Sequence, residues 1–242
     1  MTRSPVRHFA ELDSTNSEAA RLAQTGEAGP LWIVAERQTA GRGRRGRVWQ
    51  GASGNLAATL LLTTDKIPAQ AAQMAFVAAL ALADMAAAYL ADDLIRVKWP
   101  NDLLVGGAKA GGVLIESGIG PSGGLWLAVG VGANLAEAPT DTPYPATCMA
   151  AHGDAPSRDA ALAALDAGFA HWLEVWEAGG FEPVRAAWTA RAHGLGEACT
   201  VAQGERSVTG INEGLDADGA LLLRAGAAVQ RITAGDVIFG GA

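Results

Sequence analysis

The sequence predicts an α/β protein in which a larger domain of strands and helices is followed by a small β-barrel. Up to about residue 193, apolar runs of strand length alternate with longer helical segments. From Leu195 onward only short strands and turns follow, which is typical of a small all-β unit. The 242 residues suffice for one sizeable core and a small companion, so we expect domains at 1–193 and 194–242.

The first helix is expected to begin in a capping box formed by Thr15 and Glu18, and to end near Gly26. The residues before it are interpreted as its entrance. Buried strands are predicted at 31–36 and 55–62, on either side of a loop rich in glycine and arginine. The sheet therefore holds this loop at both ends.

The apolar segment 69–91 is predicted to be a buried core helix. Its length would allow a membrane span, but it is mostly alanine, is interrupted by Gln70, Gln73 and Asp84, and has no basic flank. Further strands are expected at 95–99, 103–105, 111–117 and 125–133, with Gly106-Gly107 as a tight turn. A proline-marked loop then leads to helices at about 157–178 and 183–192.

Composition and charge argue against several functional classes. The net charge of −7 disfavours a general affinity for nucleic acids, whose binding proteins usually present a basic surface. Cys148 and Cys199 match no metal or redox spacing and are expected to be reduced thiols. The N-terminus has no apolar stretch of signal-peptide length, so we expect a cytoplasmic protein.

Residues 41–47, Gly-Arg-Gly-Arg-Arg-Gly-Arg, formally satisfy the G-x-G-x-x-G pattern of dinucleotide-binding folds. That fingerprint needs a helix that opens at the glycines, whereas here turn formers and a strand follow. Five arginines lie between Arg37 and Arg47, and no acidic residue follows up to Thr64. We expect a mobile loop that closes over phosphates. A solvated basic loop and a nucleic-acid arm are the alternatives, although Trp49 alone is little for a stacking platform.

A second constellation is the string Lys-Trp-Pro-Asn-Asp at 98–102, with Lys109 beyond a short hairpin. Lys98 and Lys109 are two of the three lysines in the chain. A compact point charge where a guanidinium would not serve is one interpretation. A strand end followed by an Asn-Asp turn is an equally good one.

Glycines within predicted strands form the third constellation. Gly111 and Gly112 open the strand predicted at 111–117, and Gly130, Gly132 and Asn134 lie near the end of the next strand. Glycine in a strand indicates the close approach of a ligand or of another backbone, or a β-bulge.

Together these segments resemble the biotin–protein ligase family. The matching strings, in order, are Ser14-Thr15-Asn16, Gln38 with the 41–47 loop, 98–102, 109–116 and 130–134. The resemblance implies an α/β catalytic domain with a mixed sheet, related to class II aminoacyl-tRNA synthetases, followed by an SH3-like β-barrel. It also implies two steps. The biotin carboxylate attacks the α-phosphorus of ATP to give biotinyl-adenylate and pyrophosphate, and an acceptor lysine then attacks that anhydride.

The resemblance also implies roles for single residues. Arg44 and Lys109 are expected to be catalytic, as cations that bridge the carboxylate and the phosphates. The residues expected to bind biotin are Ser14, Thr15, Asn16, Gln38, Arg42, Gly43, Arg44, Lys109, Gly111 and Gly112. Those expected to bind the nucleotide are Arg42, Arg44, Arg47, Trp49, Asn101 and Asn134, with Asp102 as a magnesium ligand.

The implied substrates are biotin and the magnesium complex of ATP, with no tightly bound prosthetic group, and the implied partner is the biotin carboxyl carrier domain of a carboxylase. Gly235-Asp236-Val237 is expected to buttress the site or to contact that acceptor. Many family members carry an N-terminal DNA-binding domain, for which the motif at Ser14 leaves no room. We therefore expect no nucleic-acid or membrane partner, and a homodimer stays open.

One departure and three rival functions remain. The string Lys-Ala-Gly-Gly at 109–112 replaces a bulkier residue and a single glycine, which predicts a roomier pocket wall. A lipoate or octanoate ligase or transferase shares the fold and the lysine acceptor, but the arginine loop and Lys-Trp-Pro-Asn-Asp favour biotin. A nucleotide-binding regulator would need the loop but not Lys109. A dinucleotide oxidoreductase is least favoured, because no helix opens at the glycines.

Overall fold

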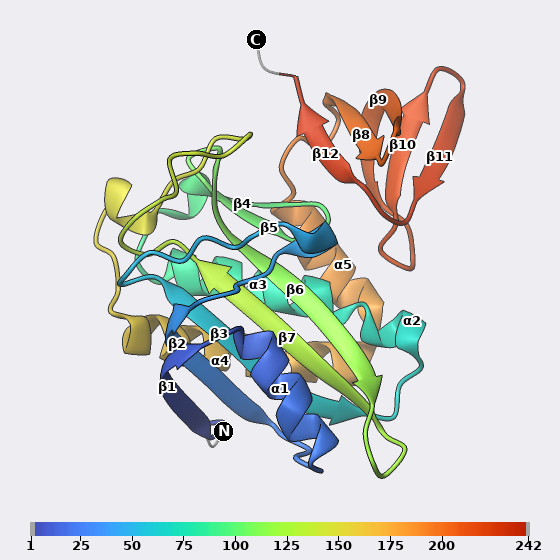
Figure 1. The fold of residues 1–242 in the computed structure, drawn as a ribbon. Coiled ribbons are helices and arrows are strands. Elements are labelled where there is room, and N and C mark those ends of the chain that lie inside the picture. Colours follow the sequence, from blue (N-terminus) through green and yellow to red (C-terminus); the bar gives the residue numbers. More distant parts are fainter. Residues whose placement is uncertain (1–2, 241–242) are drawn as a thin grey trace.

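The computed structural model describes residues 3–240, which form a seven-stranded and a five-stranded sheet (Figure 1). The expected domain ranges 1–193 and 194–242 include residues 1, 2, 241 and 242, which lie outside the described residues. The elements in chain order are β1 (Val6–Leu12), α1 (Thr15–Gln24), β2 (Leu31–Gln38), η1 (Arg44–Gly46), β3 (Leu56–Thr64), α2 (Pro68–Ala71), α3 (Met74–Ala87), η2 (Asp92–Leu94), β4 (Ile95–Lys98), β5 (Asp102–Val105), β6 (Ala108–Ile119), β7 (Leu125–Ala133), η3 (Met149–Ala151), α4 (Arg158–Gly179), α5 (Phe181–Ala190), β8 (Ala198–Gln203), β9 (Arg206–Leu215), β10 (Leu221–Ala225), β11 (Ala228–Ile232) and β12 (Asp236–Phe239).

The larger sheet is mixed, as expected. Its strand order is β1-β2-β3-β7-β6-β5-β4, with β1 parallel to β2 and every other neighbouring pair antiparallel. The expected helix entrance is confirmed just before α1, where Ser14 is the N-cap. Strand β1, which ends at Leu12, was not predicted. It lies at the sheet edge and is mostly exposed, so its sequence carries no apolar run.

Helices cover both faces of this sheet: α1 lies on one face, and α3, α4 and α5 lie on the other (Figure 1). Strand β3 shows how one segment serves both faces, because successive side chains point to opposite sides. Leu56, Ala58 and Leu60 belong to the core cluster that contains α3. Leu61 belongs to the cluster around α1, and Thr59 hydrogen-bonds to the first turn of α1.

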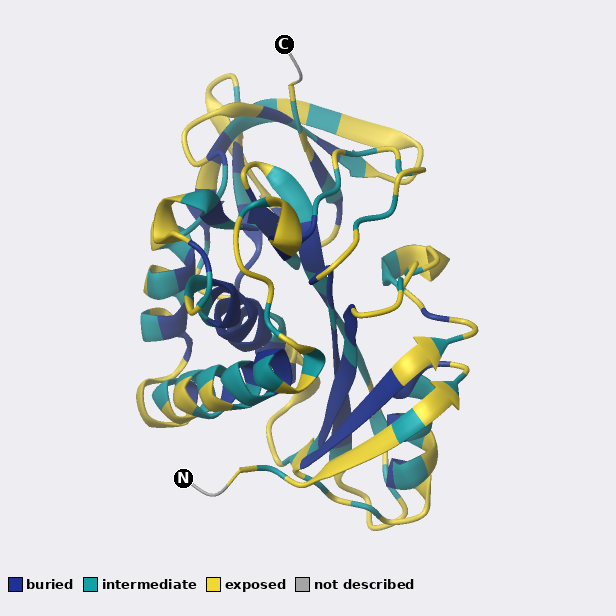
Figure 2. Ribbon diagram, turned by 90° about the vertical axis from the view of Figure 1, so that its left-hand side faces the viewer, coloured by how far each residue is buried: buried dark blue, intermediate teal, exposed yellow. Residues whose placement is uncertain are grey.

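The predicted buried core helix is confirmed, with different bounds. The segment is divided into α2 and α3, and eleven of the fourteen residues of α3 are buried, as the dark blue central helix of Figure 2 shows. Residues 68–87 are long and apolar enough to cross a membrane by length and composition, but 67% of the qualifying window is buried inside the protein. This segment is therefore the centre of the core.

Two local predictions have different outcomes. The capping box is wrong, because Ser14 is the N-cap of α1, no side chain caps it, and Glu18 pairs with Arg21. The hairpin turn is confirmed: Gly106 and Gly107 have φ values of 58° and 81°, which side chains with a Cβ rarely adopt.

The smaller sheet is antiparallel, with the order β11-β10-β9-β8-β12, and it confirms the predicted C-terminal β unit. The two sheets share one hydrophobic core. At the junction of the two units, Trp99 Nε1 donates a hydrogen bond to Gly219 O at 3.1 Å. Phe76 of α3 and Phe181 of α5 pack edge-on beside Gly219. This packing brings the start of β12 to the edge of the larger sheet, beside the 41–47 loop.

Candidate functional site

A cavity of about 540 Å³ lies where the larger sheet, the 41–47 loop and β12 meet. It collects thirteen of the fifteen residues predicted for the site. Those that line it are Ser14, Thr15, Asn16, Gln38, Arg42, Gly43, Arg44, Arg47, Trp49, Asn101, Asp102, Lys109 and Gly112. Segments far apart in the sequence thus converge on one space, as a small-molecule site requires.

Gly111 and Asn134, the other two predicted residues, lie behind the cavity wall. A Cβ at Gly111 would lie 3.2 Å from Leu82 Cδ2, so Gly111 faces α3 and allows close packing of the sheet on that helix. The amide of Asn134 is buried and donates to Thr147 O at 3.0 Å. Both residues support the wall from behind and do not line the cavity.

The end of the cavity near α1 is polar. Thr15 and Asn16 lie on the first turn of α1, and Gln38 ends β2. Gln38 Oε1 accepts from Thr15 N at 2.8 Å. The Asn16 side-chain amide donates to Glu116 Oε2 at 2.8 Å and to a backbone carbonyl of β6. Asn16 is therefore fixed with its Oδ1 directed at Thr59, 2.6 Å away.

Counting protons at Thr59 gives Thr15 a definite role. The Thr59 hydroxyl lies 2.6 Å from Asn16 Oδ1 and 2.7 Å from Thr15 Oγ1. Because an amide oxygen can only accept, the single Thr59 proton goes to Asn16. The Thr15 proton then goes to Thr59 or to Gln38 Oε1, which lies 3.2 Å from Thr15 Oγ1. The lone pairs of Thr15 Oγ1 are then available to accept from an N–H group in the cavity. Thr59 was missed in the sequence, although a threonine within an apolar strand is a usable signal.

Glycines of β7 make room for this end of the cavity. A Cβ at Gly130 would collide with the side-chain amide of Asn16, and a Cβ at Gly132 would lie 2.8 Å from Trp49 Nε1. A close approach is present at both glycines, but the approaching groups are the side chains of Asn16 and Trp49 and not another backbone. Gly112 differs, because a Cβ there would meet nothing closer than 3.5 Å.

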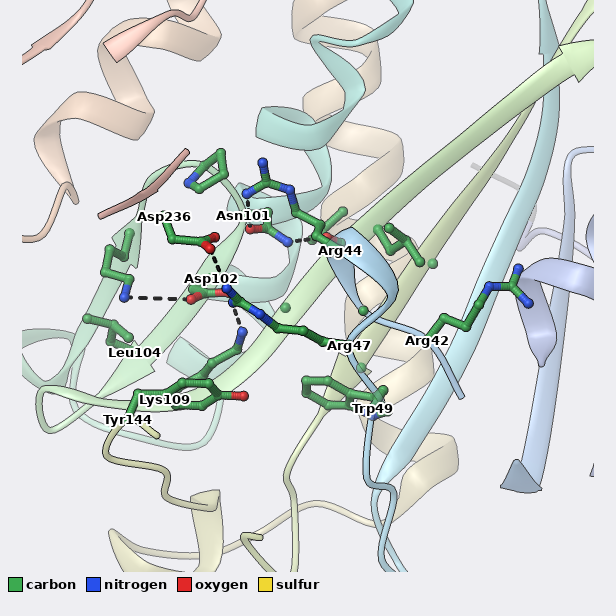
Figure 3. A pocket seen from close by; sticks show the side chains of 18 of the residues that line it. Arg42, Arg44, Arg47, Trp49, Asn101, Asp102, Leu104, Lys109, Tyr144 and Asp236 are labelled. Atoms are coloured by element: carbon green, nitrogen blue, oxygen red, sulfur yellow. Dashed lines mark hydrogen bonds and ion pairs between the residues drawn. The ribbon is translucent and has the colours of Figure 1, made fainter. Parts of the chain in front are cut away.

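The arginines of the loop point in different directions (Figure 3). Arg42 turns away from the lysines and hydrogen-bonds to Ser17 at 2.7 Å and to Glu116 at 3.0 Å. Arg44 Nη1 donates a hydrogen bond to Asn101 Oδ1 at 3.3 Å. Burial lowers the pKa of the Arg44 guanidinium below its ordinary value, but the group stays charged. Arg42 therefore fastens the loop to β6, and Arg44 is the partly buried cation.

Arg45 and Arg47 both pair with Asp236 of β12, Arg45 at 3.0 Å. Arg47 lines the cavity, whereas Arg45 does not. Asp236 was expected only to buttress the site or to contact an acceptor, and its sequence gave no hint of an arginine partner. Arg45 and Arg47 precede Asp236 by 191 and 189 positions in the sequence, so only the tertiary fold reveals these contacts.

A carboxylate between two lysines lies at the opposite end from Thr15. Asp102 Oδ1 is 2.5 Å from Lys109 Nζ, and its Oδ2 is 3.8 Å from Lys98 Nζ. Burial lowers the pKa of Lys98, and the attraction of Asp102 opposes that shift. Lys109 Nζ also lies 5.2 Å from the ring centroid of Tyr144, a cavity residue that the sequence did not single out.

Asp102 was expected to bind magnesium, but its carboxylate is shared by two lysines. Within residues 3–240, no group of three or more His, Cys, Asp or Glu side chains could hold a metal ion. Magnesium ligands are usually a carboxylate or two together with substrate phosphates. Any magnesium at this site would accordingly arrive with the nucleotide, and Asp102 would need to exchange a lysine for it.

Comparisons with known proteins agree with this geometry. The model of the Biotin/lipoate A/B protein ligase family matches residues 9–134, and the Biotin protein ligase C terminal domain matches residues 194–240. A biotin--[acetyl-CoA-carboxylase] ligase of Paracoccus denitrificans is 44% identical, over 96% of this chain and 100% of its own length. The bifunctional ligase/repressor BirA of Bacillus subtilis is 30% identical, over 95% of this chain and 72% of its own length. The biotin protein ligase from Aquifex aeolicus in complex with biotin and ATP has a TM-score of 0.81 at 25% identity, with 98% and 99% of the two chains covered.

Proposed function

The chain belongs to the biotin/lipoate A/B protein ligase family, and we propose from this premise how its cavity performs the reaction. The protein is a biotin–protein ligase, which uses ATP to attach biotin to a lysine of a biotin carboxyl carrier domain through biotinyl-5′-AMP. The observation that carries the proposal is the polarity of the cavity. Hydrogen-bonding groups lie at one end and lysine and arginine cations at the other.

The polar end suits the ureido ring of biotin. That ring presents N–H donors and a carbonyl acceptor, and buried polar groups are costly unless each is paired. Thr15 Oγ1 accepts from a ureido N–H, while Ser14 and the Gln38 amide complete the set. The relay through Thr59, Asn16 and Glu116 supports this assignment, because it leaves the Thr15 proton to an acceptor within the protein, Thr59 or Gln38. A dithiolane ring or an alkyl chain would leave these groups unpaired.

The cationic end suits the reacting groups. A carboxylate that attacks a phosphate must approach another anion, and the repulsion falls if cations lie between them. Lys109 holds the biotin carboxylate and the acyl oxygen, and Arg44 and Arg47 face the phosphates. Both the nucleophile and the leaving group belong to the substrates, so the protein contributes position and charge rather than a nucleophile of its own.

The loop 41–47 closes the cavity over the adenylate. Its beginning is fastened to β6 through Arg42 and Glu116, and its later part is fastened to β12 through Arg45 and Asp236. Exclusion of water protects the mixed anhydride from hydrolysis before the acceptor lysine arrives. Trp49 packs against Gly132 and borders the space for the adenine. Asn101, which contacts Arg44, lies at the end of the cavity that takes the nucleotide. Gly111 and Asn134 act from behind the wall.

The two domains and the cellular setting are part of the same proposal. The catalytic domain, 1–193, is of the class II aminoacyl-tRNA synthetase type, and the unit at 194–242 is an SH3-like barrel that closes one side of the cavity. The protein works in the cytoplasm, where ATP and carrier domains are found. The net charge of −7 supports the absence of a nucleic-acid partner.

Transfer to a carrier domain tests this function. Purified protein, biotin, magnesium and ATP are incubated with a carrier domain from a biotin-dependent carboxylase, and the added mass is measured by intact-protein mass spectrometry. We expect one biotinyl group on the wild-type carrier and none on a carrier whose acceptor lysine is replaced by arginine. Absence of modification on both would count against the function.

A further inference from the structure

The start of β12 lies against the arginine loop and provides its only charged partner on the smaller sheet among the described residues. Asp236 Oδ2 is 3.0 Å from Arg45 Nη1 and also contacts Arg47 Nη2. The Asp236 side chain is 23% exposed, so this pairing is partly sheltered from water. One carboxylate oxygen thus holds two guanidinium groups of the loop.

The residues on either side of Asp236 face cations as well. Gly235 O lies 3.5 Å from Arg44 Nη1, and Val237 O accepts from Lys98 Nζ at 3.3 Å. Three successive residues at the start of β12, 235–237, therefore direct oxygen atoms at cations in and beside the cavity, as the placement of Asp236 in Figure 3 illustrates. The Asp236 carboxylate supplies a full negative charge to these cations, and the two carbonyl oxygens supply partial negative charge.

The two arginines that share Asp236 differ in their access to the cavity. Arg47 lines the cavity, whereas Arg45 does not line it and pairs with Asp236 from outside. A guanidinium that pairs with a carboxylate cannot use the same N–H groups on a phosphate. A triphosphate carries more charge than one carboxylate, so it can displace Asp236 from Arg47 while Arg45 keeps its pair.

We propose that Asp236 is a positioning residue that exchanges with the nucleotide: it holds Arg47 before ATP binds, yields Arg47 to the triphosphate, and keeps the loop tethered through Arg45. This inference rests on the proposed function, because it needs Arg47 to face the phosphates of ATP. Its consequence is that part of the attraction between Arg47 and ATP is used to break an existing ion pair. Nucleotide affinity is therefore lower than the cavity could give.

The direction in which Asp236→Asn changes nucleotide affinity tests the exchange of Arg47 between Asp236 and the triphosphate. Asp236→Asn keeps the size of the side chain but removes its charge, so Arg47 is released and the competing anion is gone. We expect the Kd of the magnesium complex of α,β-methylene-ATP, measured by calorimetry on biotin-saturated protein, to fall about three- to tenfold. Asp236→Glu, which retains the charge, should stay near the wild-type value. A residue with only a structural role would weaken binding when changed.

Matched variants separate the possible results. Glu213→Gln breaks the pair with Arg224 elsewhere on the same sheet and should leave the Kd unchanged. In an Arg47→Gln background, Asp236→Asn should lose most of its effect, because the exchanging partner is absent. An equal or higher Kd in Asp236→Asn overturns the exchange while leaving the proposed function intact. Wild-type protein that binds neither biotin nor the nucleotide overturns both.

Discussion

Lys109 Nζ lies 2.5 Å from Asp102 Oδ1, at the end of the cavity opposite Thr15. The same carboxylate faces Lys98, so two ammonium groups share one anion and a positive charge is left over. An excess of cations at this point is what a carboxylate and a phosphate need in order to approach one another. The spacing between the polar end and this end sets the direction in which biotin lies.

Removal of the Lys109 charge tests whether the excess positive charge around Asp102 contributes to the reaction. We expect Lys109→Gln to slow biotin-dependent ATP–pyrophosphate exchange by about 10²-fold or more, because a preorganised cation at developing charge is lost. Lys66→Gln is the matched control, since Lys66 lies over the ring of Trp176 outside the cavity. Exchange at the wild-type rate in Lys109→Gln would remove this residue from the mechanism.

Lys98 links the site to the pH dependence of stability. Burial holds its pKa below the ordinary value of 10.5, so between the folded and unfolded pKa values the unfolded chain binds more protons. The buried charge of Lys98 therefore lowers the free energy of unfolding by its full amount at pH values below the pKa of the folded state. This destabilisation is relieved as the pH rises towards 10.5 and Lys98 loses its proton. We expect Lys98→Met to raise the free energy of unfolding at pH 7 by up to about 1 kcal/mol, and by less near pH 10.

Urea titrations of Lys98→Met at the two pH values give this difference, with Lys66→Met as the surface control. A gain that is equal at both pH values would show that packing, and not the lysine charge, is responsible. A loss of stability at pH 7 would show that the pair with Asp102 outweighs the burial of Lys98.

The relay behind Thr15 predicts a change in substrate binding without a change in the reacting groups. Thr59→Val keeps the shape of the side chain but leaves Asn16 Oδ1 without its hydroxyl donor and Thr15 with Gln38 Oε1 as its remaining acceptor. We expect the KM for biotin to rise about tenfold, while the KM for ATP changes little. Thr63→Val, at an exposed position of the same strand, should change neither constant. Equal rises in both KM values would indicate general disruption.

The close contact between Trp49 and Gly132 predicts a change that affects ATP binding and leaves biotin binding intact. Gly132→Ala places a methyl group within 2.8 Å of Trp49 Nε1, so the indole must move from the border of the cavity. We expect the KM for ATP to rise several-fold, with biotin binding retained in calorimetry. Gly124→Ala is the control, because its Cβ would meet nothing within 4 Å. Loss of biotin binding alone would mean that Trp49 belongs to the biotin end.

The sequence predicted most of the larger domain because its strands and helices carry strong apolar periodicity. The run at β2 and the alanine-rich α3 are such cases, and both are deeply buried. The edge strand β1 was missed because its side chains are mostly exposed. The capping box failed because Ser14, one residue earlier, begins the helix without a side-chain cap.

The candidate site was predictable where it lies in short, unusual strings, and less so where it depends on distant contacts. Thirteen predicted residues line one cavity, yet the same strings placed Gly111 and Asn134 there as well. Whether a residue of a strand faces the cavity or the core depends on the face of the sheet, which the motif alone did not decide. The pairing of Asp236 with the loop needed the fold of the whole chain.

Activation of biotin as its adenylate in this cavity can be followed by ATP–pyrophosphate exchange. Biotin, lipoate and octanoate are supplied separately with ATP, magnesium and labelled pyrophosphate, and incorporation of the label into ATP is followed. We expect exchange with biotin alone. Exchange driven by lipoate or octanoate instead of biotin would contradict the assignment of the polar end, and no exchange with any of the three would contradict adenylate formation itself.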